Sequence, residues 1–322
     1  MRDQSPSAHP VGDPILIDVD TGVDDAVALA LATETGANLV GVTTVAGNVP
    51  IDAATRNTID VLSYLNAGAV PVHRGASHPL VAAYQAATDV HGANGLGGAE
   101  LPPGNAREAP VAGPAAIIRA AEEHAGALTV VTLGPLTNLA IALNVRPEIT
   151  RQIAKVVVMG GAFFVPGNVT AHAEFNVYVD PDAAEQVFSA GFADITLVGL
   201  DVTHQTALTR DVWERIAPDA PGGAGLLRQI LARTFTERDM EGFFLHDPLA
   251  LAVAMYPNLV AGDPHRVSVT LSGEQRGKTM ALIAGSGPRV ATSVDAQELL
   301  GLLTDTLGLS GSSDIADLRK VD

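Results

Sequence analysis

The chain has 322 residues, of which 47% are hydrophobic and 17% charged, a composition typical of a globular protein with a sizeable core. Its 36 acidic and 19 basic residues give a formal charge of −17, so we expect it to bind neither nucleic acid nor a membrane surface, and to tolerate cations. The absence of cysteine excludes disulfides, zinc–thiolate sites, iron–sulfur clusters and cysteine nucleophiles, which leaves carboxylates, histidines, amides and hydroxyls for chemistry.

The segment before Pro14 is polar and contains proline, without the apolar run of a signal peptide. Apolar stretches elsewhere fall short of the roughly 18 residues of a membrane span. We therefore expect a flexible tail over residues 1–13, a single catalytic domain over residues 14–322 and a cytoplasmic protein.

Short runs of Val, Ile and Leu alternate with alanine-rich segments from residue 15 onward, and such runs are typical of parallel strands covered on both faces. Strands are predicted over residues 15–17, 39–45, 128–133, 155–159 and 195–200. Helices are predicted over residues 24–32, 51–65, 114–125, 136–143 and 181–190. The alternation predicts right-handed βαβ units and a Rossmann-like α/β fold, with an open, mostly parallel central sheet and helices on both faces.

Two stretches interrupt this pattern. Residues 83–107, rich in Gly, Ala, Asn and Pro, are predicted to form a long loop, and residues 218–225 a turn cluster before a helix that runs to about residue 241. Two short strands over residues 267–271 and 279–284 and an amphipathic helix over residues 296–307 are expected to complete the same domain.

Four carboxylates fall within eight residues at the end of the first predicted strand: Asp18, Asp20, Asp24 and Asp25. Like charges this close must protonate, separate or share a cation. Oxygen ligands suit Ca²⁺ or Mg²⁺, so the cluster predicts a site for a hard divalent metal. The alternative is a single helix-capping aspartate with solvated neighbours.

The same segment resembles the opening Asp-x-Asp of haloacid-dehalogenase-type phosphatases, which use the first aspartate as a nucleophile beside Mg²⁺. Those enzymes also need a lysine to offset the phosphate charge. The chain has three lysines, Lys155, Lys278 and Lys320, and Lys155 begins a predicted strand, at the wrong end for a site at the carboxyl edge. This weakens the phosphatase interpretation.

Further polar groups follow other predicted strands: Asn48, Asn138, Asn168, Glu174, Asn176, Asp201 and the pair His246–Asp247. Ligands of open α/β sheets bind at the carboxyl ends of the strands, so these residues are predicted to line one pocket. Taken singly, each has a simpler explanation, such as a cap for Asn138 or Asp247, a turn for Asn168 and a surface position for His246.

The chain resembles the inosine-uridine-type nucleoside hydrolases over about residues 15 to 255. The matching stretches, in order, are Asp18-Val-Asp-Thr-Gly-Val-Asp-Asp25, Thr43-Thr-Val-Ala-Gly-Asn48, His91-Gly-Ala-Asn-Gly95, Leu136-Thr-Asn138, Val158-Met-Gly-Gly161, Ala173-Glu-Phe-Asn176, Gly199-Leu-Asp-Val-Thr-His-Gln205 and His246-Asp-Pro248. Eight matches in order make the resemblance specific, and it implies the family's fold and a homodimer or homotetramer.

The resemblance implies Ca²⁺-dependent hydrolysis of the N-glycosidic bond of ribonucleosides, with Mg²⁺ less favoured. Asp20, Asp25, Asp247 and the backbone carbonyl of Leu133 would hold the ion, which also binds a water and the ribose 2′- and 3′-hydroxyls. Asp20 would be the general base on that water.

The resemblance also implies the residues that bind substrate. Asp24, Asn48 and Asn176 would hold the ribose diol, Asn168 and Glu174 the 5′-hydroxyl, and His246 would be the acid to the departing base. His91 lies in a glycine-containing loop, where it either contacts substrate or bonds to backbone. A non-catalytic nucleoside-binding protein is the third hypothesis, and the presence of both Asp20 and His246 argues against it.

The chain departs from the family pattern near the expected base. Thr21 replaces a common proline, Leu133 a threonine, and residues 234–245 lack the tyrosine or histidine that some members place on this helix. Phe235, Arg238 and Phe243 are candidates for base contact, although at least one is expected in the core. Structural roles are expected for His172, His204, His265 and Trp213.

Overall fold

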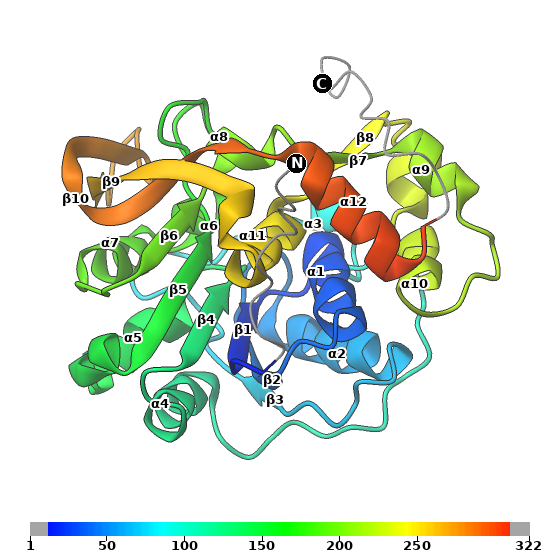
Figure 1. Ribbon diagram of the computed structural model, residues 1–322, viewed down its shortest axis with the longest axis horizontal. Coiled ribbons are helices and arrows are strands. Elements are labelled where there is room, and N and C mark those ends of the chain that lie inside the picture. Colours follow the sequence, from blue (N-terminus) through cyan, green and yellow to red (C-terminus); the bar gives the residue numbers. More distant parts are fainter. Residues whose placement is uncertain (1–11, 310–322) are drawn as a thin grey trace, which may run out of the picture.

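The computed structural model describes residues 12–309, so residues 1–11 of the predicted flexible tail and the last 13 residues of the predicted domain lie outside the described part. Its centre is an eight-stranded sheet (Figure 1). In sheet order the strands are β3 (Val72–Arg74), β2 (Leu39–Thr44), β1 (Ile15–Val19), β4 (Leu128–Thr132), β5 (Ile153–Met159), β6 (Ile195–Val198), β10 (Thr279–Val294) and β9 (Val260–Val269). Neighbouring strands are parallel except at the edge, where β9 runs antiparallel to β10. The predicted α/β fold is confirmed.

Helices cover both faces of the sheet (Figure 1). One face carries α1 (Val23–Glu34), α2 (Ile51–Tyr64) and α11 (His246–Met255), with α10 (Gly222–Ile230) and α12 (Ala296–Leu307) packed on the outer side of α1. The other face carries α4 (Gly113–Glu123), α5 (Thr137–Val145) and α7 (Pro181–Ser189). Every residue of β1 is buried, because its side chains alternate between these two cores.

Short elements complete the described part of the chain. They are α3 (Thr88–His91), α6 (Phe175–Val179), α8 (Leu200–Thr203), α9 (Arg210–Arg215), the hairpin of β7 (Ala207–Thr209) and β8 (Gly242–Phe244), two 3₁₀ turns at Pro147–Arg151 and Pro257–Leu259, and a π-helical turn at Arg233–Glu237. Among the described helices, none combines the length and the apolar character that a membrane span requires.

Several predicted bounds were wrong. The helix expected to reach residue 241 ends as α10 at Ile230, and the chain then makes the π-helical turn, a left-handed residue at Asp239 (φ 54°) and strand β8. Helix α10 begins at Gly222, inside the expected turn cluster. The strand expected over residues 279–284 extends to Val294, since its far half pairs with β6 and β9.

The order in which the strands are added to the sheet reverses between β1 and β4, so the carboxyl ends of these two strands lie at a topological switch point. From β1 the order runs through β2 to β3 on one side, and from β4 through β5 to β6 on the other. A crevice opens outside the carboxyl ends of the strands at such a point. The aspartates that follow β1, Asn48 after β2 and Leu133 after β4 therefore meet at one place.

Candidate active site

A cavity of about 550 Å³ lies at these strand ends. Most of the predicted site residues line it: Asp24, Asn48, His91, Leu133, Asn168, Glu174, Asn176, His246 and Asp247. The remaining two, Asp20 and Asp25, are fully buried and contact the lining residue Asn48. The fold thus brings together segments that are more than 200 residues apart in the sequence.

The start of helix α1 positions Asp25. Its carboxylate accepts hydrogen bonds from the backbone N–H groups of Gly22 (2.8 Å) and Asp20 (3.2 Å), which caps the helix. One carboxylate oxygen from each of Asp24, Asp25 and Asp247 lies within 4.8 Å of the other two. Helix α11 supplies Asp247 from its first turn, so two helix starts point their acidic residues at one spot.

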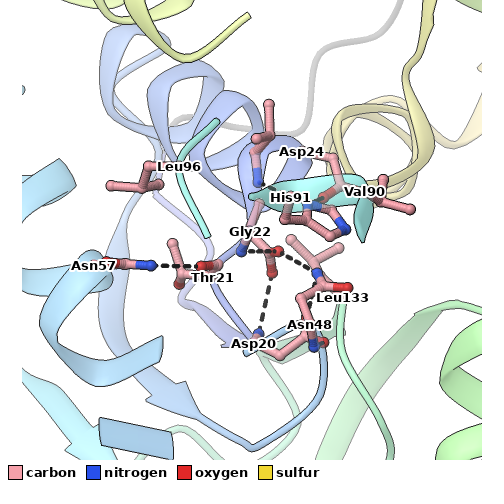
Figure 2. A network of polar contacts seen from close by, with 12 residues as sticks. Asp20, Thr21, Gly22, Asp24, Asn48, Asn57, Val90, His91, Leu96 and Leu133 are labelled. Carbon is pink, nitrogen blue, oxygen red and sulfur yellow. Dashed lines mark hydrogen bonds and ion pairs between the residues drawn. The ribbon is translucent and has the colours of Figure 1, made fainter. Parts of the chain in front are cut away.

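Asp20, predicted as a ligand together with Asp25 and Asp247, is not one of these three residues, whose third member is Asp24. It is linked to Asp25 through its own N–H and through the Asn48 amide, and it contacts the loop after β2. Its carboxylate accepts hydrogen bonds from the backbone N–H (2.6 Å) and the side-chain amide (3.2 Å) of Asn48. A Cβ at Gly47 would lie 2.0 Å from Asp20 Oδ2, and one at Gly134 would lie 2.9 Å from Asp20 Oδ1. Figure 2 shows Asp20, Asn48 and Leu133 close together below the start of α1. Two glycines therefore make room for this carboxylate.

Burial and mutual repulsion disfavour ionisation of these aspartates. Desolvation is the largest cause and raises the pKa of Asp24 and of Asp25 to about 6, and repulsion from Asp24 is the next cause for Asp25. Desolvation, followed by repulsion from neighbouring aspartates, raises the pKa of Asp20 and of Asp247 well above the usual value. The four groups cannot all be ionised unless a positive charge compensates them.

The donor set fits a hard divalent cation. Asp24 Oδ1 is buried and has no hydrogen-bond partner among residues 12–309, so it is free to bind an ion. The Leu133 carbonyl accepts one hydrogen bond, from the Asn176 amide (2.7 Å), and keeps a second lone pair. Carboxylate and carbonyl oxygens are the ligands that Ca²⁺ and Mg²⁺ take in proteins.

Glu174 and Asn176 line the same cavity from the start of α6. The Glu174 carboxylate caps α6 by accepting from the N–H groups of Asn176 (2.8 Å) and Val177 (3.1 Å), and it also accepts from Gly161 N–H (3.0 Å). Burial raises the pKa of Glu174. Asn168 lies on the exposed loop between β5 and α6 and lines the cavity from there.

His91 is bonded to backbone, one of the two roles that the sequence left open, and it also lines the cavity. Its Nδ1 accepts a hydrogen bond from the backbone N–H of Val23 (3.1 Å) and lies 3.8 Å from Asp24 Oδ1, and its ring also lines the cavity (Figure 2). A Cβ at Gly22 would lie 2.5 Å from this nitrogen, so glycine is needed for the ring to sit there. Burial lowers the pKa of His91 to about 4.

His246 is half-buried at the start of α11. Its Nδ1 lies 2.8 Å from the Thr203 hydroxyl, and burial, with smaller effects of His204 and His91, lowers its pKa to about 3. His204, for which a structural role was expected, lines the cavity and packs against Phe244 (ring centroids 4.7 Å) and His246 (5.7 Å). Thr203 was not predicted from the sequence, although it lies in the Gly199–Gln205 stretch.

Asp18 and Asn138 form a polar link beneath the site that the sequence did not predict. The Asp18 carboxylate accepts from the Thr43 hydroxyl (2.5 Å) and the Asn138 amide (2.7 Å). The Asn138 amide also donates to the Thr44 carbonyl (2.9 Å), instead of capping its own helix. Burial raises the pKa of Asp18 to about 7.

Of the three residues considered for base contact, Arg238 and Phe243 line the cavity. Phe235 is fully buried and packs against Trp213 (ring centroids 5.2 Å), as expected for at least one member of the group. Of the described residues that line the cavity, none is a lysine, and Lys155 Nζ instead lies 3.5 Å from the Ala254 carbonyl. The cavity therefore offers no support for the phosphatase interpretation.

Comparison with known proteins gives a consistent result. The family model described as inosine-uridine preferring nucleoside hydrolase matches residues 15–301. The chain is 35% identical to the probable uridine nucleosidase 2 of Arabidopsis thaliana, over 91% of this chain and 97% of that one. It is also 35% identical to the pyrimidine-specific ribonucleoside hydrolase RihA of Escherichia coli, over 91% and 98% of the two chains.

A solved structure agrees in fold. The purine-preferring ribonucleoside hydrolase from Gardnerella vaginalis superposes with a TM-score of 0.86 at 34% identity, covering 92% of this chain and 98% of that one. Family match, curated relatives and fold coincide over nearly the whole described chain. The protein belongs to the inosine-uridine preferring nucleoside hydrolase family and is a ribonucleoside N-glycosyl hydrolase.

Proposed function

We propose that the chain hydrolyses ribonucleosides to ribose and free base in a Ca²⁺-dependent reaction, with Asp20 as the general base. The observation that carries this proposal is the convergence of Asp24, Asp25 and Asp247 beside Asp20, with Asp24 Oδ1 buried and unpaired among the described residues. Asp20, Asp25, Asp247 and the Leu133 carbonyl would hold the ion, and Asp24 lies within reach of the same spot. A bound Ca²⁺ would lower the pKa of the surrounding carboxylates and of a water, and would bind the ribose diol.

Asp20 would remove a proton from the attacking water. Its two hydrogen bonds from Asn48 hold the carboxylate in one orientation. A base held in one orientation reacts without first having to be ordered, which lowers the barrier.

The acidic end of the cavity would bind the sugar. Asp24, Asn48 and Asn176 would hold the ribose diol, and Asn168 and Glu174 the 5′-hydroxyl. Breaking the N-glycosidic bond builds positive charge on the sugar, as O-glycoside hydrolysis does, and surrounding carboxylates favour that charge. Groups that bond to the 2′-hydroxyl are left unpaired by a deoxyribose, so 2′-deoxynucleosides should be poor substrates.

His246 would donate a hydrogen bond to the departing base as a neutral imidazole. Because burial lowers its pKa to about 3, the ring carries no charge at neutral pH. If the Thr203 hydroxyl donates to Nδ1, the hydrogen of the ring sits on Nε2, the nitrogen left for the substrate. In this role Thr203 is a positioning residue.

The test is a reducing-sugar assay of the purified protein on uridine, cytidine, inosine, adenosine and 2′-deoxyuridine, with and without a chelator. We expect ribose from at least one ribonucleoside, loss of the activity on chelation, recovery with Ca²⁺, and no product from the deoxy compound. Undiminished activity in the chelator-treated protein would contradict the metal dependence. Absence of product from all five would contradict the proposed substrate class. Oligomeric state and cytoplasmic location stay predictions from the sequence.

A further inference from the structure

One side-chain amide joins several of the segments that supply the site. Asn138 is fully buried at the start of α5, and its amide nitrogen donates to the Asp18 carboxylate on β1 (2.7 Å) and to the Thr44 carbonyl at the end of β2 (2.9 Å). Its amide oxygen accepts from the Ala76 N–H in the loop after β3 (2.8 Å). These three hydrogen bonds use both donors of the amide, and they tie four segments of the chain together.

Glycines make room for this amide. A Cβ at Gly75 would lie 2.3 Å from Asn138 Oδ1 and 2.4 Å from Nδ2, and a Cβ at Gly113 would lie 3.3 Å from Nδ2. An alanine at Gly75 would therefore displace the amide or the loop that packs against it. Close packing as well as hydrogen bonding fixes the position of the Asn138 side chain.

The end of β2 leads directly to the residue that holds the proposed general base. The Thr44 carbonyl is bound by Asn138, and the Ala46 N–H donates to the carbonyl of Ala76 (2.9 Å), whose own N–H is bound by Asn138. Two residues further on, the backbone and side-chain N–H groups of Asn48 donate to the carboxylate of the general base. The amide therefore restrains this loop directly at its first residue and through Ala76 at its third.

The other side of Asp20 is bounded by the loop that precedes Asn138 in the chain. The first residue of that loop, Leu133, donates its N–H to the Asp18 carbonyl (2.7 Å), and its own carbonyl is proposed to bind the ion. A Cβ at Gly134 would lie 2.9 Å from Asp20 Oδ1, so the loop passes close to the carboxylate. Because Asn138 bonds to the side chain of the same Asp18, it fixes α5 and the loop before it relative to β1.

We propose that Asn138 is a positioning residue for the metal site, which fixes the Leu133 carbonyl and the Asp20 carboxylate relative to each other. This inference rests on the proposed function. Asn138 is not among the described residues that line the cavity, so it acts through these two groups and not on the substrate. Residues that orient metal ligands contribute to the affinity for the ion, because misplaced ligands bind it less well.

Thr137, the neighbour of Asn138 on α5, offers a matched control. It is also fully buried, and its hydroxyl donates to the Asp180 carboxylate (2.7 Å). Asp180 caps helix α7 and is not among the described residues that line the cavity. Thr137→Ala and Asn138→Ala therefore both remove buried hydrogen bonds at the start of one helix, and only the second removes bonds to the segments that supply the site.

The experiment measures Ca²⁺ binding to the chelator-stripped full chain by isothermal titration calorimetry, together with melting curves of the metal-free protein. Asn138→Ala should raise the Kd for Ca²⁺ about 10- to 100-fold, and Thr137→Ala should change it by less than about 3-fold. Both variants should lower the melting temperature, because each loses buried hydrogen bonds. The Ca²⁺ affinity thus distinguishes positioning of the ligands from a general loss of stability.

Steady-state kinetics at saturating Ca²⁺ give a second readout. Asn138→Ala should lower kcat on uridine about 10-fold, because the general base is no longer held in one place, and Thr137→Ala should leave kcat unchanged.

Gly75→Ala tests the same hydrogen bonds without removing the amide, and it decides the question if Asn138→Ala does not fold. Gly75 lies in a half-buried loop, which can shift to admit a methyl group. Such a shift separates Asn138 from its partners, so the Kd for Ca²⁺ should again rise about 10-fold.

Equal Ca²⁺ affinities of Asn138→Ala and Thr137→Ala, or an unchanged affinity in Gly75→Ala, would overturn the proposal. A destabilised Asn138→Ala protein with the Ca²⁺ affinity and kcat of the wild type would overturn it as well, since Asn138 would then have a purely structural role. Failure of the proposed function is distinguishable, because then the wild-type protein would release no ribose from any ribonucleoside. A wild-type protein that binds no Ca²⁺ would contradict the proposed metal dependence and this inference with it.

Discussion

At the scale of single residues, Asp20 occupies a position that only small neighbours allow. The loop after β2 and the loop after β4 each pass it with a glycine, Gly47 and Gly134. Either loop would collide with the carboxylate if it carried a side chain there. The proposed general base is therefore positioned by steric fit as well as by its hydrogen bonds from Asn48.

Gly47→Ala should lower kcat on uridine by about 100-fold or more, because its Cβ would lie 2.0 Å from Asp20 Oδ2 and must displace that carboxylate. The measurement is steady-state kinetics together with a thermal melt. Gly301→Ala is the matched control, since a Cβ there meets nothing within 4 Å and lies inside helix α12. It should keep full activity and be neutral or slightly stabilising. Equal kinetics for the two variants would contradict the proposed role of Asp20.

At the scale of elements, helix α8 contacts the His246 imidazole through the Thr203 hydroxyl. The Thr203 hydroxyl lies 2.8 Å from Nδ1 of the imidazole and is fully buried. One turn later the Thr206 hydroxyl donates to the Thr203 carbonyl (3.0 Å), a hydrogen bond that stabilises the same segment. Substituting these two threonines one at a time therefore distinguishes an effect on catalysis from an effect on folding stability.

Thr203→Val should reduce kcat on uridine by about 10-fold, because a buried Nδ1 loses its partner and the ring is no longer held as one tautomer. Thr206→Val should cost about 1 kcal/mol of folding stability with kcat unchanged. Kinetics and urea unfolding of both variants test this pair of expectations. The outcome that counts against it is a kcat loss in Thr206→Val as large as in Thr203→Val.

Elements with a local signal could be predicted, and those that depend on distant partners could not. Strand β1 and helices α1 and α2 follow from continuous apolar runs and helical periodicity. Strand β3 has three residues, and the far half of β10 is a strand only because β6 and β9 flank it. The local sequence cannot indicate such strands, because they form only through pairing with distant neighbours.

The residues of the candidate site divide in the same way, into those with a local sequence signal and those that depend on distant partners. The aspartates after β1 were predictable because they crowd within a few residues, and Asp247 because the stretch His246-Asp-Pro248 matches the family pattern. The cavity position of His204 and the contact of Thr203 with His246 depend on how α8 packs beside β8 and α11, which no sequence spacing indicates. The place of Asp18 in a link to Asn138, 120 residues away, is equally a result of the sheet order.

At the scale of the whole molecule, the fold concentrates acidic groups at one point of a protein whose formal charge is already −17. Burial raises the pKa of Asp18 to about 7 and of Asp24 and Asp25 to about 6, from an unperturbed 3.8. A carboxyl whose pKa is raised by folding contributes stability below its unfolded pKa and loses it as the pH rises through the folded value. Near neutral pH these buried carboxylates therefore lower the free energy of unfolding unless a cation is bound.

In the presence of chelator, the melting temperature should therefore fall as the pH rises from about 4 to 7, the window set by these shifts. The lowered pKa values of His91 and His246 act in the opposite sense between about 6.5 and 3, but the raised carboxylates outnumber them. Since Ca²⁺ binds ionised carboxylates, its stabilising effect should grow over the same range. Melting curves at a series of pH values with chelator and with Ca²⁺ check this. Coincident curves at every pH would exclude a metal at the aspartate cluster.

If the carboxylate cluster acts through a bound divalent cation, ribose release must depend on how much of the protein carries the ion. Protein stripped by chelation and verified metal-free by elemental analysis is titrated with Ca²⁺, while bound metal and the rate of ribose release from uridine are followed together. We expect a rate of ribose release near zero without metal that rises in proportion to bound Ca²⁺ and levels off at one ion per chain. Full ribose release by the verified metal-free protein would contradict it.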